Sequence, residues 1–189
     1  MIKIRIILIA LLTTVAGFSQ GQVNFANRVG SGGSVLNAPV TLAGSQNGPG
    51  PDYSVELLLS ANGSLTPLTP ISTFNPAGTG AAAISSQFWA AKTVDVPGVF
   101  GGQSAIFVVR AWKSSYGSFA AAFAAGETGA SDPFTVTVGG AGQDPSVPPA
   151  TPANLTTLKS FTVSVVPEPS TIALALLGGG LLLGCRVRR

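Results

Sequence analysis

Hydrophobic and polar residues alternate in short runs along most of the chain, and these runs predict strands. In residues 53–60 the apolar side chains from Tyr53 to Leu59 share one face, whereas Ser54 and Glu56 fall on the other. This period of two is typical of a half-buried strand. The chain is therefore expected to be built mainly from strands that cover one core.

Three further runs are strong strand predictions. Residues 134–138 and 161–165 each place Phe and two Val on one face and hydroxyl side chains on the other. Residues 104–112 contain an almost continuous apolar stretch, which favours a central strand covered on both faces. Weaker runs, bounded by Gly, Pro, Asn and Ser, predict strands at residues 23–28, 39–43 and 93–96.

One short helix is predicted between the strands at 104–112 and 134–138. Ser118 is placed to cap it, Phe119 and Phe123 have the i,i+4 spacing of one helix face, and Gly126 is placed to end it. About seven strands and one helix favour an all-β fold, an antiparallel β-sandwich over residues 20–165. Residues 139–154, rich in Gly and Pro, are expected to form a long surface loop.

The first nineteen residues have the pattern of a secretory signal peptide. Lys3 and Arg5 precede an apolar run at residues 6–16, and small residues follow it. Cleavage between Ser19 and Gln20 fits the small-residue rule best, although a cut before Gln22 remains open. This segment, 1–19, is therefore expected to be removed from the exported protein.

The last segment, 166–189, combines three elements in order. Pro167 and Pro169 hold Glu168 on a stiff, extended backbone. An uncharged apolar stretch follows at residues 172–185. This stretch is expected to be a C-terminal membrane helix, although it is shorter than the roughly 20 residues of a relaxed spanning helix.

Three arginines complete this segment: Arg186, Arg188 and Arg189. Basic residues next to an apolar stretch stay on the cytoplasmic side of a membrane. The arginines are therefore expected to act as a basic stop.

The Pro-Glu-Pro element, the apolar stretch and the basic end together resemble the PEP-CTERM sorting signal of Gram-negative bacteria. The resemblance implies recognition at Pro167, Glu168 and Pro169 by an exosortase, an integral-membrane cysteine transpeptidase that cleaves nearby. It also implies export across the inner membrane, a membrane-held precursor and final residence at the cell surface or in an extracellular matrix, often beside exopolysaccharide. The central part, including residues 22–27 and 110–112, loosely resembles exported PEP-CTERM proteins of Verrucomicrobia-like bacteria.

The charge balance is set by the termini. The sequence has 10 basic and 7 acidic residues, but five of the basic residues lie in the two terminal segments. Without them the balance is slightly acidic, so the sequence pI of about 9.4 does not indicate a nucleic-acid partner.

The residue types exclude several kinds of catalytic and metal site. The chain has no His, and its single cysteine is Cys185 in the tail. Ser-His-Asp, Cys-His and histidine-bearing zinc sites are therefore impossible, and we expect no catalytic residues, metal or cofactor. A carboxylate-only glycan hydrolase is the remaining enzyme class, with Asp52 and Glu56 as candidates, but solvated carboxylates are the more frequent situation.

We therefore expect a non-catalytic exported surface or extracellular-matrix protein, sorted and cleaved at its C-terminal signal. The alternative is a carbohydrate-binding module of the exopolysaccharide matrix, in which aromatic rings stack on sugars. Its candidate residues are Trp89, Trp112 and Tyr116. For Trp112, packing or a cation–π contact with Arg110 is favoured over sugar binding.

Overall fold

The computed structural model describes residues 20–30 and 36–165. The strands in its first half are β1 (Gly21–Phe25), β2 (Arg28–Val29), β3 (Leu36–Asn37), β4 (Val40–Leu42), β5 (Tyr53–Ala61), β6 (Ser64–Pro67) and β7 (Ser72–Thr73). Those in the second half are β8 (Lys92–Val96), β9 (Ser104–Lys113), β10 (Thr128–Ala130), β11 (Phe134–Thr137), β12 (Gly139–Gly140), β13 (Ala153–Asn154) and β14 (Phe161–Val163). The helices are the 3-10 segments η1 (Gly80–Gln87) and η2 (Ser114–Tyr116) and the α-helix α2 (Phe119–Ala125).

Strands β5 and β9 form the centre of the larger sheet. They are the two longest strands and pair antiparallel from Tyr53 opposite Lys113 to Ser60 opposite Ile106. Strands β6 and β7 extend this sheet beyond β5, and β10 and β11 pair with successive halves of β9. The period-two pattern of β5 is explained by this arrangement, because one face of the strand contributes Val55, Leu57 and Leu59 to the core. The almost continuous apolar stretch of β9 is also explained, because Val108 is buried as well as its neighbours Phe107 and Val109.

The second sheet is organised around β1, the first strand of the described chain. It pairs antiparallel with β8 over five residues, antiparallel with β12, and parallel with β13. Two small ladders complete the fold: β14 runs parallel to β4, and β2 pairs antiparallel with β3.

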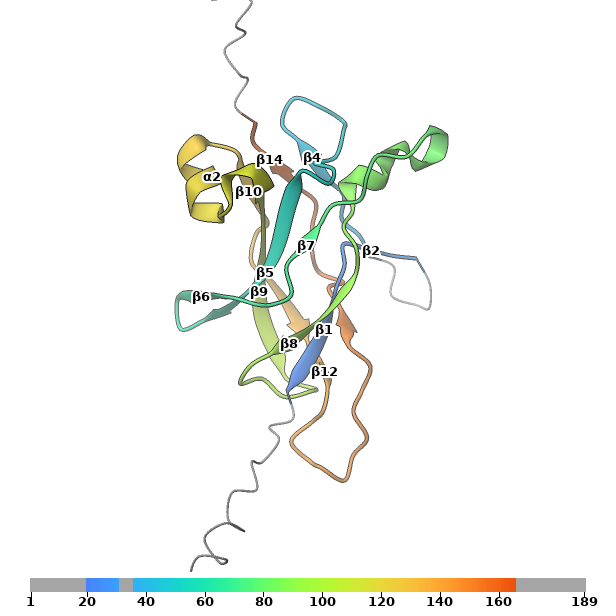
Figure 1. Ribbon diagram of the computed structural model, residues 1–189. Coiled ribbons are helices and arrows are strands. Elements are labelled where there is room, and N and C mark those ends of the chain that lie inside the picture. The colour runs from blue at the N-terminus through green and yellow to red at the C-terminus, as the bar shows by residue number, and fades with distance from the viewer. Residues whose placement is uncertain (1–19, 31–35, 166–189) are drawn as a thin grey trace, which may run out of the picture.

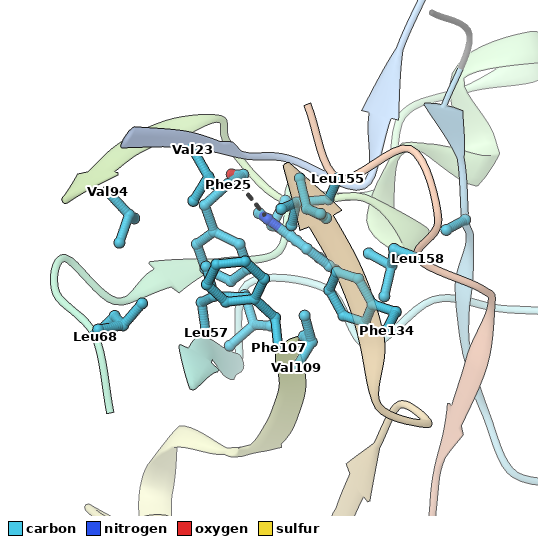
Figure 2. Close-up of a cluster of buried hydrophobic side chains, with 14 of the residues drawn as sticks. Val23, Phe25, Leu57, Leu68, Val94, Phe107, Val109, Phe134, Leu155 and Leu158 are labelled. Carbon is cyan, nitrogen blue, oxygen red and sulfur yellow. Dashed lines mark hydrogen bonds between the residues drawn. The ribbon is translucent and has the colours of Figure 1, made fainter. Parts of the chain in front are cut away.

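Both larger sheets send side chains into one hydrophobic core (Figure 2). Phe25 of β1, Leu57 of β5 and Phe107 of β9 are fully buried there. The rings of Phe107 and Phe134 lie 6.2 Å apart, centroid to centroid. Because no cysteine lies outside the tail, packing and hydrogen bonds hold this core together without a disulfide.

Asn27 joins β1 to two distant segments. Its side chain is fully buried and donates to the carbonyls of Ala38 and Gln87, both at 2.9 Å. Its amide oxygen accepts a hydrogen bond from the backbone of Trp89 at 3.1 Å. These bonds satisfy a polar group that would otherwise be costly to bury.

The helix prediction is confirmed in detail. α2 begins after Ser118, whose hydroxyl accepts a hydrogen bond from the backbone of Ala121, and it ends at Gly126 in the left-handed conformation (φ 78°). A glycine adopts this conformation without the strain of a Cβ atom. The local signals in the sequence were therefore sufficient to place this helix.

The all-β prediction and the antiparallel pairing are confirmed for the larger sheet. Two ladders, β1 with β13 and β4 with β14, are parallel, which an antiparallel sandwich did not include. The prediction of a loop over residues 139–154 was partly wrong, because both of its ends form short strands beside β1. The signal peptide at 1–19 and the C-terminal helix at 172–185 lie outside the described residues.

Candidate functional site

The last strand leads directly towards the C-terminal segment. β14 lies alongside β4, with Phe161 opposite Val40 and Val163 opposite Leu42. The carbonyl of Val163 accepts a hydrogen bond from the backbone of Ala43 at 2.8 Å. β14 is therefore held along one side by the chain that follows β4.

The opposite side of β14 is held by β10. The backbone N–H of Ser164 donates to the carbonyl of Thr128 at 3.0 Å. Gly129 lies so close that a Cβ atom there would overlap the carbonyl oxygen of Thr162 and would lie 2.8 Å from the Cα of Val163. Only glycine fits this approach without a shift of the backbone.

The folded part of the chain extends to Val165. Val163 is fully buried, and the half-buried Val165 packs against the core. No free linker therefore separates the last strand from the segment that begins at Val165.

That segment has a recognisable sequence. Residues 165–189 match the family model described as the PEP-CTERM protein-sorting motif. The chain carries a PEP-CTERM sorting motif. This motif implies exosortase-dependent sorting of an exported protein that is processed at the membrane and reaches the cell surface. No curated protein and no solved structure matches the chain.

The PEP-CTERM motif begins where the described structure ends. Its predicted recognition residues, Pro167, Glu168 and Pro169, lie outside the described residues, and so does the basic stop of Arg186, Arg188 and Arg189. At the predicted signal cleavage site, Ser19 also lies outside them, whereas Gln20 is described and exposed. No helix in the described ranges is long and apolar enough to cross a membrane.

The two tryptophans predicted as sugar-binding residues are buried. Trp89 is 4% exposed and donates from its indole nitrogen to the carbonyl of Phe25 at 3.1 Å, the dashed line in Figure 2. Its ring packs against the rings of Phe25 and Phe74, with centroids 5.1 and 5.6 Å away. Trp89 therefore has no open face for a sugar, which corrects that part of the hypothesis.

Trp112 is also buried, which agrees with the packing role favoured for it. Its ring meets the edge of Phe119 at 6.2 Å. The guanidinium of Arg110 lies 4.4 Å from the Phe119 centroid, so the cation–π partner is Phe119 and not Trp112. Only Tyr116 of the three candidate aromatics is exposed.

The candidate catalytic carboxylate Glu56 is committed to an ion pair. Glu56 on β5 lies directly opposite Arg110 on β9, and its carboxylate accepts a hydrogen bond from the guanidinium. Asp52 precedes β5 and is exposed. This ion pair was not predicted from the sequence, because Glu56 and Arg110 are 54 positions apart and meet only through the register of β5 against β9.

A second buried carboxylate, Glu127, was also missed. It is 5% exposed, lies 3.2 Å from the ammonium of Lys113 and accepts a longer hydrogen bond from Tyr116 at 3.4 Å. The hydrogen bond and the charge of Glu127 raise the pKa of Lys113. The pKa of Tyr53 is raised as well, mainly by the burial of its hydroxyl and to a smaller extent by the charge of Glu127. The cluster is an ion pair that neutralises a buried charge.

A polar surface groove of about 600 Å³ lies between β11 and the chain around β13. Its lining includes Thr135, Thr137, Thr156 and Thr157, and it contains no aromatic ring. Thr157 already donates to the carbonyl of Thr135 at 2.7 Å. Across the described residues, no group of three or more acidic, His or Cys side chains is placed to hold a metal ion.

Proposed function

We propose that this chain is a non-catalytic exported surface or extracellular-matrix protein, cleaved by an exosortase at its PEP-CTERM motif. The observation that carries the proposal is the motif match at residues 165–189. The signal-peptide pattern of residues 1–19 supports export, since it is the segment that a secretory translocase recognises. The apolar stretch at 172–185 would hold the precursor in the inner membrane until cleavage.

The fold supports a specific geometry for this processing. Because β14 is held on both sides up to Ser164, only residues from about 166 onward are available to an enzyme. The segment that the exosortase recognises therefore starts from Val165, which packs against the core of the folded part. We propose that the enzyme works within a few residues of β14, close to α2.

The test is the replacement Glu168→Ala, with Ser170→Ala as the matched control in the same segment. We expect Glu168→Ala to leave an uncleaved, membrane-held precursor, whereas Ser170→Ala is processed like the native chain. Intact mass of the protein recovered from the cell surface and from membranes reports both cleavages. Normal cleavage of the Glu168→Ala chain would contradict recognition at the Pro-Glu-Pro element.

The pairing of its two buried carboxylates supports a non-catalytic role for the folded part. Its two buried carboxylates, Glu56 and Glu127, are each neutralised by a basic side chain, Arg110 and Lys113. A general acid or nucleophile must instead face the substrate. Turnover of a polysaccharide that is lost in Glu56→Gln, in protein shown to remain folded, would overturn this part of the proposal.

Carbohydrate binding remains the second candidate, and it now depends on Tyr116 and on the threonine-lined groove. Tyr116 is 37% exposed, enough for one ring face to meet a sugar. Binding on a glycan array that is lost in Tyr116→Ala but kept in Ile84→Ala would favour this candidate. Trp89→Ala is unsuitable for this test because it removes a core side chain.

A further inference from the structure

Helix α2 presents an apolar face to solvent. Its seven residues are only phenylalanine and alanine, yet only Ala122 is buried. Phe123 is 68% exposed, more than any other large hydrophobic side chain of the described residues. A helix that is apolar all round is normally covered by protein or lipid. The face that contains Phe123 therefore lacks a partner within the folded part described.

Phe123 is held in this exposed position by a series of aromatic contacts. The ring of Phe123 stacks on Phe119 at 6.0 Å, and Phe119 meets the buried ring of Trp112 edge-on at 6.2 Å. Arg110 covers another part of Phe119. The three rings thus lead from the core to the surface, so Phe123 projects outward from a fixed base.

This apolar face lies close to the start of the sorting motif. α2 is followed by Thr128, whose carbonyl accepts the hydrogen bond from Ser164. The five residue-to-residue steps from Phe123 to Thr128 span at most about 18 Å. α2 and β14 lie at the same end of the molecule, and β12 lies at the other (Figure 1). Any structure that receives the tail therefore also approaches α2.

The distance to the membrane is limited in the same way. Six residues, 166–171, separate Val165 from the apolar stretch at 172–185. Fully extended, they reach at most about 20 Å. While that stretch is in a bilayer, Val165 stays within about 20 Å of the lipid surface, and α2 lies at the same end of the molecule as β14 (Figure 1). The 3-10 helix η1, with Ile84 47% exposed, is a second uncharged projection at this end.

We propose that the exposed face of α2 contacts the lipid bilayer while the tail holds the precursor there. The proposal rests on the membrane retention given under Proposed function. Phe123 enters the interfacial region, and Tyr116, whose hydroxyl bonds to Glu127, lies at headgroup level beside it. α2 carries no charge that would have to be desolvated. The contact would orient the molecule with its C-terminal strand towards the membrane-embedded enzyme.

A site-specific probe tests the contact directly. Because Cys185 is the only cysteine, the full chain with Cys185→Ser accepts a single new thiol. An environment-sensitive fluorophore is attached to Phe123→Cys in one chain and to Val147→Cys in the other. Val147 is a matched control, since it is 56% exposed and belongs to the loop between β12 and β13, at the opposite end in Figure 1. Both chains are reconstituted in phosphatidylethanolamine and phosphatidylglycerol vesicles that contain a doxyl-labelled lipid.

We expect the lipid quencher to reduce the emission severalfold more at position 123 than at position 147. Equal quenching at the two positions, with the chain bound to vesicles, would overturn the contact while leaving membrane retention intact. A probe at 123 that is shielded from aqueous iodide but not quenched by lipid would also overturn it, because a second chain or the tail then covers α2. Failure of the full chain to float with vesicles would instead remove the membrane retention on which the contact depends.

Discussion

The first and last strands of the folded part are held in very different ways. β1 lies inside its sheet, with β8 along one side and β12 and β13 along the other. β14 pairs over three residues with β4 and gains two further backbone bonds, from Ala43 to Val163 and from Ser164 to Thr128. The predicted signal peptide at residues 1–19 therefore precedes a deeply integrated strand, whereas the PEP-CTERM motif follows a strand with fewer attachments.

This difference indicates where the molecule opens most easily. Local opening of a protein has a low free energy where few buried contacts and hydrogen bonds must break. Opening β14 breaks one short ladder, whereas opening β1 disrupts a whole sheet. Transient opening at β14 would lengthen the segment available to the exosortase without unfolding the core.

The largest expected effect compares the same substitution at the two ends. Phe25 on β1 is fully buried, whereas Phe161 on β14 is only half-buried. We expect Phe25→Ala to lower the free energy of unfolding by about 3–5 kcal/mol, the usual range for a buried phenylalanine. Phe161→Ala should lower it by less than half as much. Urea unfolding of both variants measures the two losses of unfolding free energy. Equal losses would contradict the conclusion that β14 is held less firmly than β1.

A substitution at Gly129 should loosen β14 selectively. A side chain at this position overlaps the backbone of Thr162, so Gly129→Val is expected to cost about 1–3 kcal/mol. Hydrogen exchange should become faster at the amide of Ala43, which donates to Val163 of β14, and at the amide of Ser164, which follows β14 and donates to Thr128. Exchange should stay slow in β1. Gly30→Val, where nothing lies within 4 Å of the added Cβ, is the control. Uniformly faster exchange in both strands would show that β14 does not open separately.

The cap of α2 should have a smaller effect at the same end. Ser118→Ala removes the hydrogen bond to the backbone of Ala121, and it should lower the free energy of unfolding by about 1 kcal/mol. Ser118→Asp keeps an acceptor and should restore most of the loss. A loss as large as that of Phe25→Ala would mean that α2 is integrated as firmly as β1.

The smallest expected effect is a pH dependence from the ion pair beside α2. Glu127 raises the pKa of Lys113 above 10.5, so the folded chain holds that proton more tightly than the unfolded chain does. The resulting stabilisation is complete below about pH 10.5 and is lost as the pH rises through the folded pKa. The pKa of Tyr53, raised from 10.0, acts in the same direction.

We therefore expect the free energy of unfolding to decrease as the pH rises through this alkaline range. In Glu127→Gln the decrease with pH should be smaller. Urea unfolding from about pH 8 to about pH 11 gives the slope for each chain. An unchanged slope in Glu127→Gln would show that the alkaline loss comes from other groups.

Features encoded over a few residues could be predicted from the sequence. The helix at 119–125, with its Ser118 cap and Gly126 end, was placed correctly because cap and periodicity are local signals. The strands at 53–60, 104–112 and 134–138 were found for the same reason, to within one residue at each end. The sorting motif was also identified in full, since its three elements are consecutive.

Features that depend on pairing across the chain could not be predicted. β12 and β13 have two residues each, too few to show a period, and they are strands only because β1 lies between them. The Glu56–Arg110 pair depends on the register of β5 against β9. Trp89 follows no periodic run, and its burial results from Phe25 and Phe74, which are distant in sequence.

The position of β1 also bears on how the chain would fold during the predicted export. The predicted signal peptide at residues 1–19 would bring the chain out from residue 20 onward, so β1 would emerge before any of its partners. Its nearest partner in sequence is β8, and the bond from Asn24 to Asn154 joins residues 130 positions apart. Contacts between such distant residues form slowly and only after the later segments are present. In that order of export this sheet would close only after β13 had crossed the membrane, so the chain would stay unfolded for most of its passage.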